Sequence, residues 1–376
     1  MIPFNKAVLA GNEFKYIKNA YDKGKLSGDG YYTVKCHEWL KKNLNAKNAL
    51  LTHSATAALE MSAILLDIKN GDEVIMPSYT FVSTANAFVM RGATPVFVDI
   101  NPHTLCIDEK KIESAINKKT KAIVVVHYAG VSSEMKKILS IAKKYKIAIV
   151  EDAAQCILSK YKDKYLGTIG DLGCFSFHET KNITCGEGGA LLINNEELFE
   201  RAQHIREKGT NRNQFLSGKV DKYTWVDKGS SFLPGEINAA FLFAQLQKSK
   251  VLTRKRIKIW NKYNSFFKKV RETFKLELQI LPSYNTHNAH MYYVLFENEN
   301  KRNDFMNLTF KMEVNCVFHY IPLHSSPAGK RYGKVNGKMN VTDNISSRLL
   351  RMPLWVGIEK HQKKIFNIFE KALKQI

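Results

Sequence analysis

Three residues with chemically active side chains follow two short runs of this sequence. Asp152 ends the run IAIVED, and His178 and Lys181 follow the run GCFSF. Both runs have the length and composition of strands buried in a parallel sheet, and ligands of such sheets bind beyond the carboxyl ends of the strands. Alone, the aspartate is as easily an ion pair or a cap, and the lysine a surface residue. Together they favour one site at the edge of a sheet.

A third segment, LLTHSATAALE, has the residues to bind an anion. Ser54 precedes a predicted helix whose first residues, Ala55 and Thr56, are small. The first N–H groups of a helix have no internal partner and lie at its positive end. Ala55 and Thr56 would therefore offer backbone amides to an anion, and Thr56 a hydroxyl as well. Simple capping of the helix by Ser54 is an equally good interpretation.

The combination of these residue types meets the needs of pyridoxal phosphate (PLP). This cofactor requires a lysine amine for covalent attachment, a carboxylate beside its pyridine nitrogen and an anion site for its phosphate. Asp152 would keep the pyridine nitrogen protonated, and Lys181 would hold the cofactor and later move a proton. A loop and one strand separate the two residues, so both can face one cavity. We therefore expect PLP and no metal ion.

Short strand-like runs alternate with longer helical patterns through the first part of the chain. The apolar residues of each run are continuous and do not alternate with polar ones. The runs therefore predict strands buried on both faces, in a mostly parallel sheet with helices on both sides. No strand is expected immediately before Ser54. The predicted strands span 73–76, 95–99, 122–127, 147–151, 173–177 and 189–193, and the predicted helices span 54–67, 82–91, 108–117 and 134–145.

The pattern changes after about residue 235. We expect a large α/β domain over 1–240 and a smaller α+β domain over 241–376, joined by a long helix. The elements predicted there are a helix at 236–260, strands at 290–296 and 314–318, and a helical tail at 360–375.

The composition is that of a globular protein with an excess of positive charge. Hydrophobic residues make up 44%, which excludes a disordered or fibrous chain. The 57 Lys and Arg residues against 35 Asp and Glu residues give a net charge of +22. A nucleic-acid-binding protein is one interpretation. The basic residues are dispersed, mostly as Lys pairs, so a solvated surface that also attracts an anionic substrate is favoured.

The cysteine pattern and the hydropathy indicate a cytoplasmic protein. No apolar run approaches the roughly 18 residues that span a bilayer, and the first residues lack a secretory signal. The cysteines show no CxxC spacing, which suggests buried thiols in a reducing compartment. They are Cys36, Cys106, Cys156, Cys174, Cys185 and Cys316.

Four longer segments resemble one enzyme family. PSYTFVSTANAF, VEDAAQ, CFSFHETKNITCGEGGALL and HYIPLH are similar to the DegT/DnrJ/EryC1/StrS family of PLP-dependent sugar-nucleotide aminotransferases. The resemblance covers nearly the whole chain and is densest over 2–235. It implies the fold of aspartate aminotransferase (fold type I), with a large PLP-binding domain and a smaller C-terminal domain.

The resemblance also implies roles for individual residues. Lys181 would attach the cofactor and Asp152 would contact its ring nitrogen, with His178 shaping the site beside them. The other matches are Gln155 at the phenolic oxygen, Phe81 against the ring, and Ala55, Thr56 and Ser176 at the phosphate. Without the family, core packing and helix capping would explain Phe81 and Gln155.

One segment departs from the family pattern. Many members have a GxNxR motif, whose Asn reaches the cofactor phosphate of the partner subunit. In GSSFLP, at 229–234, Ser231 replaces that Asn and Leu233 replaces the Arg. A serine hydroxyl can still donate to phosphate, so Ser231 is retained as a cofactor-binding residue. The resemblance implies a homodimer with shared active sites.

Substrate-binding residues are expected in two further segments. His319, Tyr320 and His324, in FHYIPLH, match a segment near the sugar pocket of the family. Arg206 and Arg212, in IREKGTNR, suit a carboxylate or a diphosphate, because a guanidinium binds such anions with two N–H groups. Structural histidines and surface arginines are the simpler interpretations.

The segments REKGTNRNQFLSGKVDKYTW and NAHMYYVLF are most similar to family members that form dTDP-4-amino-4,6-dideoxygalactose. We expect transfer of the amino group of L-glutamate to C4 of dTDP-4-dehydro-6-deoxy-D-glucose, giving dTDP-4-amino-4,6-dideoxy-D-galactose for a surface polysaccharide. Amination at C3 and the gluco epimer at C4 remain open. Lys181 argues against the related dehydratases, which have His there. A non-catalytic, basic nucleic-acid-binding protein is the alternative of another class.

Overall fold

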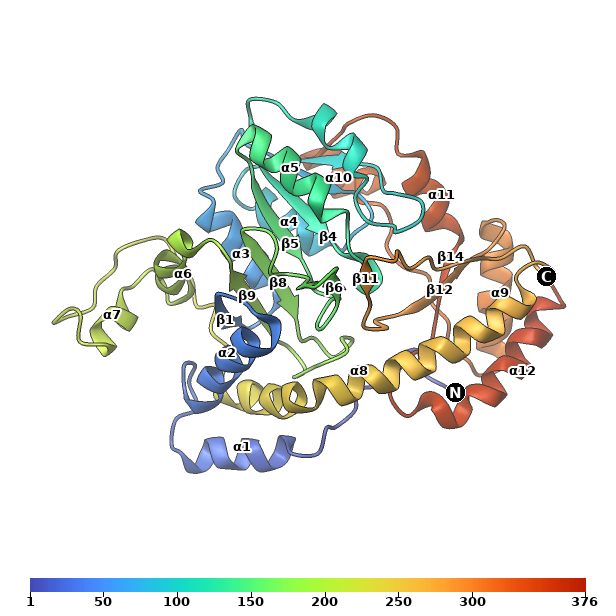
Figure 1. Cartoon of the computed structure of the whole chain (residues 1–376), viewed down its shortest axis with the longest axis horizontal. Helices are drawn as coiled ribbons and strands as arrows, with labels where there is room; N and C mark the ends of the chain where they lie inside the picture. The colour runs from blue at the N-terminus through green and yellow to red at the C-terminus, as the bar shows by residue number, and fades with distance from the viewer.

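The computed structural model describes residues 1–376, and its largest element is an eight-stranded sheet (Figure 1). The strand order is β1-β9-β8-β5-β4-β2-β3-β13. β9 is antiparallel to both its neighbours, and every other pair is parallel. The strands are β1 (Asn48–Thr52), β2 (Glu73–Pro77), β3 (Thr94–Val98), β4 (Thr120–Val126), β5 (Ala148–Asp152), β8 (Leu172–Ser176), β9 (Gly189–Ile193) and β13 (Lys334–Val335).

Helices cover both faces of this sheet because successive strand residues point to opposite sides. In β4, Ile123 packs into the cluster that includes α2, α5 and the first half of α8, whereas Val124 packs into the cluster that includes α3, α4 and α6. This arrangement confirms the mostly parallel α/β sheet predicted from the continuous runs. The helices are α2 (Tyr31–Leu44), α3 (Ala55–Leu65), α4 (Val82–Val89), α5 (Met135–Tyr145), α6 (Phe199–Arg206) and α8 (Glu236–Val270).

A smaller antiparallel sheet lies at the other end of α8 (Figure 1). Its strands are β10 (Glu277–Leu278), β12 (Tyr292–Leu295) and β14 (Leu349–Met352), and α9 (Glu299–Lys311) and α12 (Gln362–Leu373) pack with them into a separate apolar cluster. Ile2 also belongs to this cluster, so the N-terminus lies beside the C-terminal part of the chain. The segment with α10 (Pro327–Tyr332), β13 and α11 (Asn340–Arg348) returns to the edge of the large sheet, where β13 pairs with β3.

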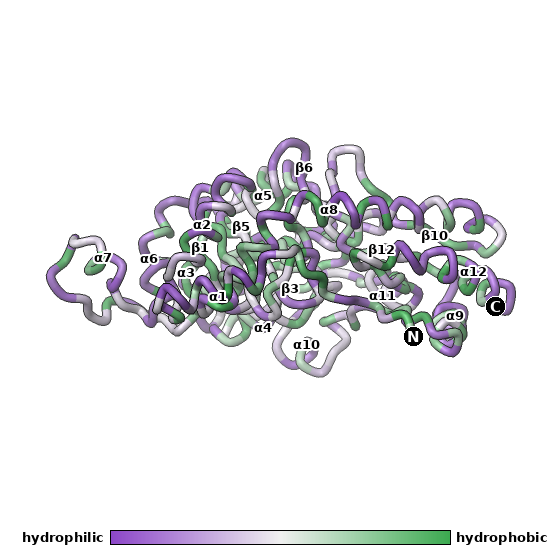
Figure 2. Tube along the Cα trace, turned by 90° about the horizontal axis from the view of Figure 1, so that it is seen from below, coloured by the Kyte–Doolittle hydropathy of each residue, from purple (hydrophilic) through white to green (hydrophobic).

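The remaining elements are short or peripheral. α1 (Glu13–Asp22) packs against α8, and α7 (Arg212–Leu216) lies in a segment that projects away from the large sheet (Figures 1 and 2). The hydropathy in Figure 2 shows this projection as mostly hydrophilic. A third sheet contains β6 (Lys160–Tyr161), β7 (Lys164–Tyr165) and β11 (Asn285–Thr286), and the 3-10 turns are η1 (Glu109–Lys111), η2 (Glu113–Ala115), η3 (Tyr128–Gly130), η4 (Glu196–Leu198), η5 (Leu323–Ser325) and η6 (Ile358–His361).

The long helix α8 connects the two apolar clusters. Leu252 packs into the cluster beneath the large sheet and Ile259 into the cluster of the small sheet. The helix also continues ten residues beyond the predicted end at 260. We propose that the boundary between the two domains lies between Leu252 and Ile259, somewhat after the expected division at 240.

Three sequence-based predictions of elements are wrong. The helix predicted at 108–117 consists of the turns η1 and η2, because the Asp108 and Asn117 side chains accept hydrogen bonds from nearby backbone N–H groups and favour turns. The segment 314–318, predicted as a strand, forms only two isolated bridges with different partners, Val314 with Ile2 and Val317 with Arg351. The segment before Ser54, expected to lack a strand, forms β1.

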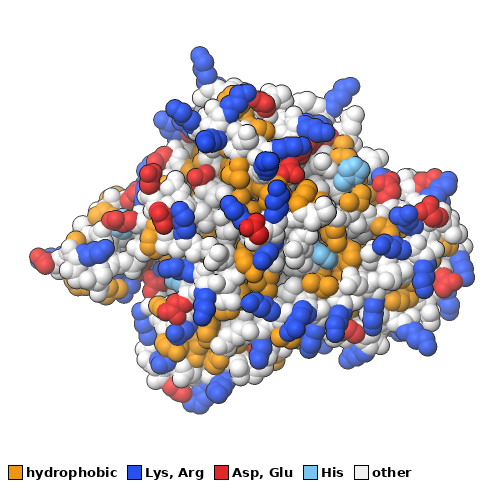
Figure 3. All heavy atoms as spheres, viewed as in Figure 1, with side chains coloured by type: hydrophobic (Ala, Val, Ile, Leu, Met, Phe, Trp, Pro, Cys, Tyr) orange, Lys and Arg blue, Asp and Glu red, His pale blue; other side chains and the backbone are white.

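The excess positive charge of the chain lies on its surface. Lys and Arg side chains are spread over the face shown in Figure 3, with a row along the lower edge where α8 runs. Between its first residue, Glu236, and its end, α8 has no acidic residue. No helix of the chain combines the length and the apolar character needed to cross a membrane.

Candidate active site

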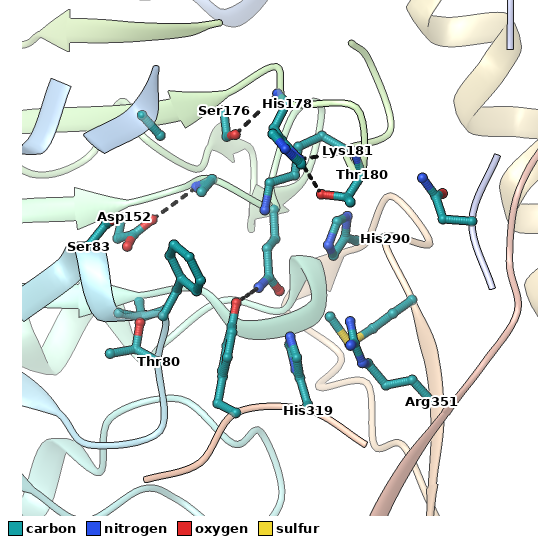
Figure 4. A pocket seen from close by; sticks show the side chains of 18 of the residues that line it. Thr80, Ser83, Asp152, Ser176, His178, Thr180, Lys181, His290, His319 and Arg351 are labelled. Carbon is teal, nitrogen blue, oxygen red and sulfur yellow. Dashed lines mark hydrogen bonds between the residues drawn. The ribbon is translucent and has the colours of Figure 1, made fainter. Parts of the chain in front are cut away.

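A cavity of about 800 Å³ lies between the large sheet and the small sheet (Figure 4). Its walls come from the carboxyl ends of β5 and β8, the starts of α3 and α4, the middle of α8, and the strand β14. This is the position in which open parallel sheets bind ligands. The cavity contains Ala55, Thr56, Phe81, Asp152, Gln155, Ser176, His178, Lys181, His319 and Tyr320, all of which were predicted as site residues.

Lys181 and Asp152 enter this cavity from neighbouring strand ends (Figure 4). The Lys181 amine points into the cavity and has no hydrogen-bond partner in the chain, although its backbone N–H donates to the His178 carbonyl at 2.9 Å. Burial lowers the pKa of Lys181, and the nearby Asp152 carboxylate opposes this shift. The amine is therefore more readily unprotonated near neutral pH than that of a surface lysine.

Asp152 is held by two donors. The Thr84 hydroxyl donates to its Oδ2 at 2.7 Å, and the Ala154 backbone N–H donates to its Oδ1 at 3.2 Å. Thr84 in turn accepts from the Thr80 hydroxyl at 2.8 Å, since its own proton points at the carboxylate. The carboxylate, only 7% exposed, is thus fixed at the floor of the cavity.

The start of α3 provides an anion site of the predicted kind. The Ser54 hydroxyl caps the helix by accepting from the Ala57 N–H at 3.1 Å, so the capping interpretation holds. The N–H groups of Ala55 and Thr56 have no partner in the chain and line the cavity. The Thr56 and Ser83 hydroxyls lie 2.8 Å apart beside them. Capping and anion binding are therefore compatible here.

A glycine permits the close approach of β9 to this helix. A Cβ at Gly189 would lie 2.3 Å from the Ser54 carbonyl carbon and 2.5 Å from the Ala55 nitrogen, well inside contact distance. Ser176, at the end of β8, pairs with Gly189 in the ladder, and its hydroxyl accepts from the His178 N–H at 3.4 Å. The end of β8 and the start of β9 thus place small residues around the anion site.

Gln155, Tyr320 and Phe81 form another wall. The Gln155 side chain accepts from the Ala129 N–H at 2.6 Å and donates to the Tyr320 hydroxyl at 2.9 Å, which fixes its amide orientation. Phe81 precedes α4, and its ring lies 6.2 Å from that of Tyr320. The Phe81 side chain is 56% exposed, so one face of the ring is free to contact a ligand.

Two histidines at the small-sheet side of the cavity are held neutral. Burial and the positive charges of Lys181 and Arg351 lower the pKa of His290 and His319 well below the ordinary value. His290 Nδ1 donates to the Asn182 amide oxygen at 3.0 Å, because the amide nitrogen is used by the Asn288 carbonyl. The opposite nitrogen of His290 is therefore an acceptor.

Several predicted residues do not lie in the cavity. Ser231 is exposed and bridges to Glu207, and Arg212 forms an ion pair with the same glutamate at the projecting segment. Arg206 is buried against Asp29 and the Leu51 carbonyl. The remaining residue is His324, whose ring contacts the Ser78 hydroxyl at 2.7 Å and the Asp343 carboxylate at 3.2 Å.

The site also depends on residues that were not predicted from the sequence. Thr84 is buried behind Asp152 and holds its carboxylate; it could have been noticed, because it is a hydroxyl residue three positions after Phe81 at the start of a helix. His290 lies in NAHMYY, where the sequence predicted the start of a strand but no site residue. Arg256 lies in the basic run TRKRIK, which is typical of a solvated helix face. Arg351 stands alone in the apolar run LLRMPLW, and this isolation is the signal by which it could have been found.

The six cysteines are all free and buried. Burial raises the pKa of their thiols, which keeps them protonated and unreactive. Their predicted role as small core residues is confirmed. Within the chain, no cluster of His, Cys, Asp and Glu side chains is arranged to hold a metal ion.

The residues of the cavity fit pyridoxal phosphate. The unpartnered Lys181 amine, the fixed Asp152 carboxylate and the free N–H groups of Ala55 and Thr56 are the three features that the cofactor requires, and all of them face one space. We propose that Ser176 and Gln155 contact the phosphate and the phenolic oxygen, and that Phe81 covers the ring.

Comparison with known proteins agrees with this geometry. Residues 8–370 match the DegT/DnrJ/EryC1/StrS aminotransferase family. The chain is 30% identical over 364 residues to the GDP-perosamine synthase of Escherichia coli O157:H7, covering 96% of this chain and 95% of that protein. It is 31% identical over 365 residues to the spore coat polysaccharide biosynthesis protein SpsC of Bacillus subtilis (strain 168), covering 94% and 92%.

A solved structure shows the same fold along its full length. The PMP form of the putative sugar aminotransferase Spr1654 from Streptococcus pneumoniae superposes with a TM-score of 0.92 and 25% identity, covering 100% of both chains. The expected fold type I architecture is thereby confirmed, as is the expected cofactor. The chain belongs to the DegT/DnrJ/EryC1/StrS aminotransferase family and is a sugar aminotransferase that depends on pyridoxal phosphate.

Proposed function

We propose that the enzyme transfers the amino group of L-glutamate to C4 of dTDP-4-dehydro-6-deoxy-D-glucose, forming dTDP-4-amino-4,6-dideoxy-D-galactose for a surface polysaccharide. The observation that carries the amino-transfer chemistry is the free Lys181 amine opposite the fixed Asp152 carboxylate in one cavity. The choice of sugar rests on the segments REKGTNRNQFLSGKVDKYTW and NAHMYYVLF, which resemble enzymes that form this product.

The residues of the chain have distinct tasks in this proposal. When bound, PLP supplies the electron-accepting ring and the carbonyl group that takes up the amine. Asp152 keeps a positive charge on the ring nitrogen, and Thr84 holds the Asp152 carboxylate in place. Lys181 would hold the cofactor and act as general base and acid in proton transfer, a task suited to its lowered pKa. His178, half-exposed beside Glu187, shapes the cavity rim.

The main rivals differ in nucleotide, position or configuration. Similarity to a GDP-perosamine synthase makes a GDP-linked keto sugar the first alternative to test. Amination at C3 and the gluco configuration at C4 use the same residues, and the configuration depends on which face of the sugar meets the cofactor. Family membership weighs against the non-catalytic nucleic-acid-binding alternative.

The projecting segment supports a homodimer as part of the same proposal. It presents Trp225, 79% exposed, together with Leu216 and Tyr223, to solvent. Apolar side chains on an extended segment are typical of an interface. In such a dimer, Arg212 and Ser231 would lie where they can serve the partner's active site. We also propose a cytoplasmic location, where nucleotide sugars are made.

The proposal is tested with purified enzyme, PLP, L-glutamate and dTDP-4-dehydro-6-deoxyglucose, with NMR analysis of the product. An axial amine at C4 is the expected result. An equatorial amine, or an amine at C3, would overturn the galacto assignment and leave the aminotransferase chemistry intact. If no sugar product forms while glutamate still removes the visible absorption of the lysine-bound cofactor, the sugar is a different one, and the GDP-linked keto sugar is tested next.

A further inference from the structure

Arg351 brings an unpaired positive charge into the cavity from the small sheet. It lies on β14, and Figure 4 shows its guanidinium directed toward His319 and His290. Its Nε and Nη2 donate to the Phe318 carbonyl at 3.3 and 3.0 Å, and its guanidinium lies 4.7 Å from the Phe4 ring centroid. No carboxylate lies within 4.0 Å of it, and its Nη1 has no acceptor in the chain.

The other charged groups around the cavity cannot neutralise Arg351. The acidic residues that line it are Asp152 and Glu187. Asp152 is bound to Thr84, and Glu187 faces His178 at 3.5 Å. Arg351 is partly buried at the cavity wall, and this burial lowers its pKa while no carboxylate of the chain opposes the shift. An arginine in this position is stabilised when a ligand supplies the anion.

The second arginine of the cavity is already committed. Arg256, on α8, donates from Nε to the Ala289 carbonyl at 3.0 Å and from Nη2 to the His290 carbonyl at 2.7 Å. These bonds tie α8 to the segment that precedes β12. Arg351 also uses Nε and Nη2, and both guanidiniums leave Nη1 free. Arg256 is only 5% exposed and is tied to two carbonyls. Arg351 is partly exposed and its guanidinium is directed toward His319 and His290 in the cavity, so it is the better placed of the two to bind an anion.

We infer that Arg351 is the residue that binds a carboxylate of the amino donor. This inference deepens the proposed function, because it names the donor-binding residue of the same site. Arg351 and Lys181 line the same cavity, so an anion bound to Arg351 lies in the space that the Lys181 amine faces. The α-carboxylate of an amino acid is one carbon away from its amine. The diphosphate of a nucleotide sugar is attached at C1, across the ring from C4, and fits this place less well.

The test measures the two half-reactions separately. Arg351→Gln removes the positive charge, and Arg351→Lys keeps the charge but cannot form a bidentate pair of hydrogen bonds. Losing a charge-assisted pair costs about 1.5–3 kcal/mol, so L-glutamate should bind ~10–100-fold more weakly to the PLP-loaded Gln variant, with the Lys variant between. The reaction of the amine-loaded form with the nucleotide sugar should change by less than about threefold. Arg254→Gln, which removes an exposed charge from α8, is the matched control.

A second readout does not depend on catalysis. Glutarate, a dicarboxylate without an amine, should bind the PLP-loaded wild-type enzyme in a calorimeter and bind the Gln variant ~10-fold or more weakly. Unchanged binding of glutamate and glutarate by Arg351→Gln would overturn the inference. A loss confined to the half-reaction with the nucleotide sugar would overturn the inference and assign Arg351 to the sugar diphosphate. An equal loss in both half-reactions, with a lowered thermal unfolding temperature, would overturn it and assign Arg351 to the fold. Neither measurement with glutamate or glutarate contains the sugar, so a wrong choice of sugar leaves this test intact.

Discussion

The hydroxyl of Thr84 should be needed for full activity, because it orients the carboxylate that faces the cofactor. Thr84→Val keeps the shape of the side chain but replaces the donor to Asp152 Oδ2, now at 2.7 Å, with a methyl group. Thr84 is fully buried, so no water takes its place at once. A hydrogen bond to a charged group contributes about 1.5–3 kcal/mol. With only the Ala154 N–H left, Asp152 loses its fixed orientation.

The expected result is a rate constant for the glutamate half-reaction that falls ~10–100-fold, which is the same free energy expressed as a rate. The rate is followed by stopped-flow absorption of the lysine-bound cofactor. Thr84→Ser keeps the hydroxyl and should stay within about threefold of wild type, whereas a simple loss of packing would affect both variants. Thr80→Val removes only the next donor in the chain and should have a smaller effect. A Val variant with a wild-type rate would refute the positioning role.

Three further perturbations follow from individual contacts. Gly189→Ala places a Cβ 2.3 Å from the Ser54 carbonyl carbon, so α3 must shift and PLP retention on dialysis should fall at least ~10-fold; full retention would contradict the close approach. Glu236→Gln weakens the carboxylate bonds, 2.7 to 3.0 Å long, to three backbone N–H groups around the start of α2, and should lower the free energy of unfolding in urea by about 3 kcal/mol. Burial lowers the pKa of His37 to about 3, with Nε2 accepting from the Leu51 N–H at 2.8 Å. Below the unfolded-state pKa of 6.5, His37 binds a proton in the unfolded chain but not in the folded chain. The free energy of unfolding therefore falls as the pH drops from 7 toward 3, by up to ~1.4 kcal/mol per pH unit. The variant His37→Gln should reduce that slope.

The sequence predicted the elements whose patterns are local. The β-branched runs that became β4 and β5 are buried on both faces and were found within two residues at either end. β1 was missed because its run, NALLT, is short and its place is set by pairing with β9, which lies far along the chain. The segment 314–318 has strand composition but bonds to two separate partners. A strand therefore depends on a continuous neighbour as well as on its own residues.

The site residues also divide into those whose position follows from the local pattern and those whose position depends on the rest of the fold. Asp152 and Lys181 were predictable because Asp152 ends β5 and Lys181 lies in the loop that follows β8, so both lie at the carboxyl edge of the sheet, where ligands bind. His319 and His324 lie five positions apart in one segment, yet only His319 enters the cavity. Between them the chain passes Pro322 into η5, which turns His324 toward Ser78. Residue type and spacing could not reveal this turn.

The arginines show what decides whether a charged side chain can bind a ligand. Arg206 was a reasonable candidate from its polar segment, but Asp29 and a backbone carbonyl already occupy its guanidinium, so its charge stabilises the fold. Arg351 occurs in the apolar run LLRMPLW, where a strand residue gains nothing from being charged unless something pairs with it. The structure shows no acidic partner for it and places it in the cavity. A lone arginine within an apolar strand that ends at a ligand cavity is thus a stronger indication of anion binding than arginines within a polar loop, because its charge has no carboxylate partner in the chain and faces the ligand.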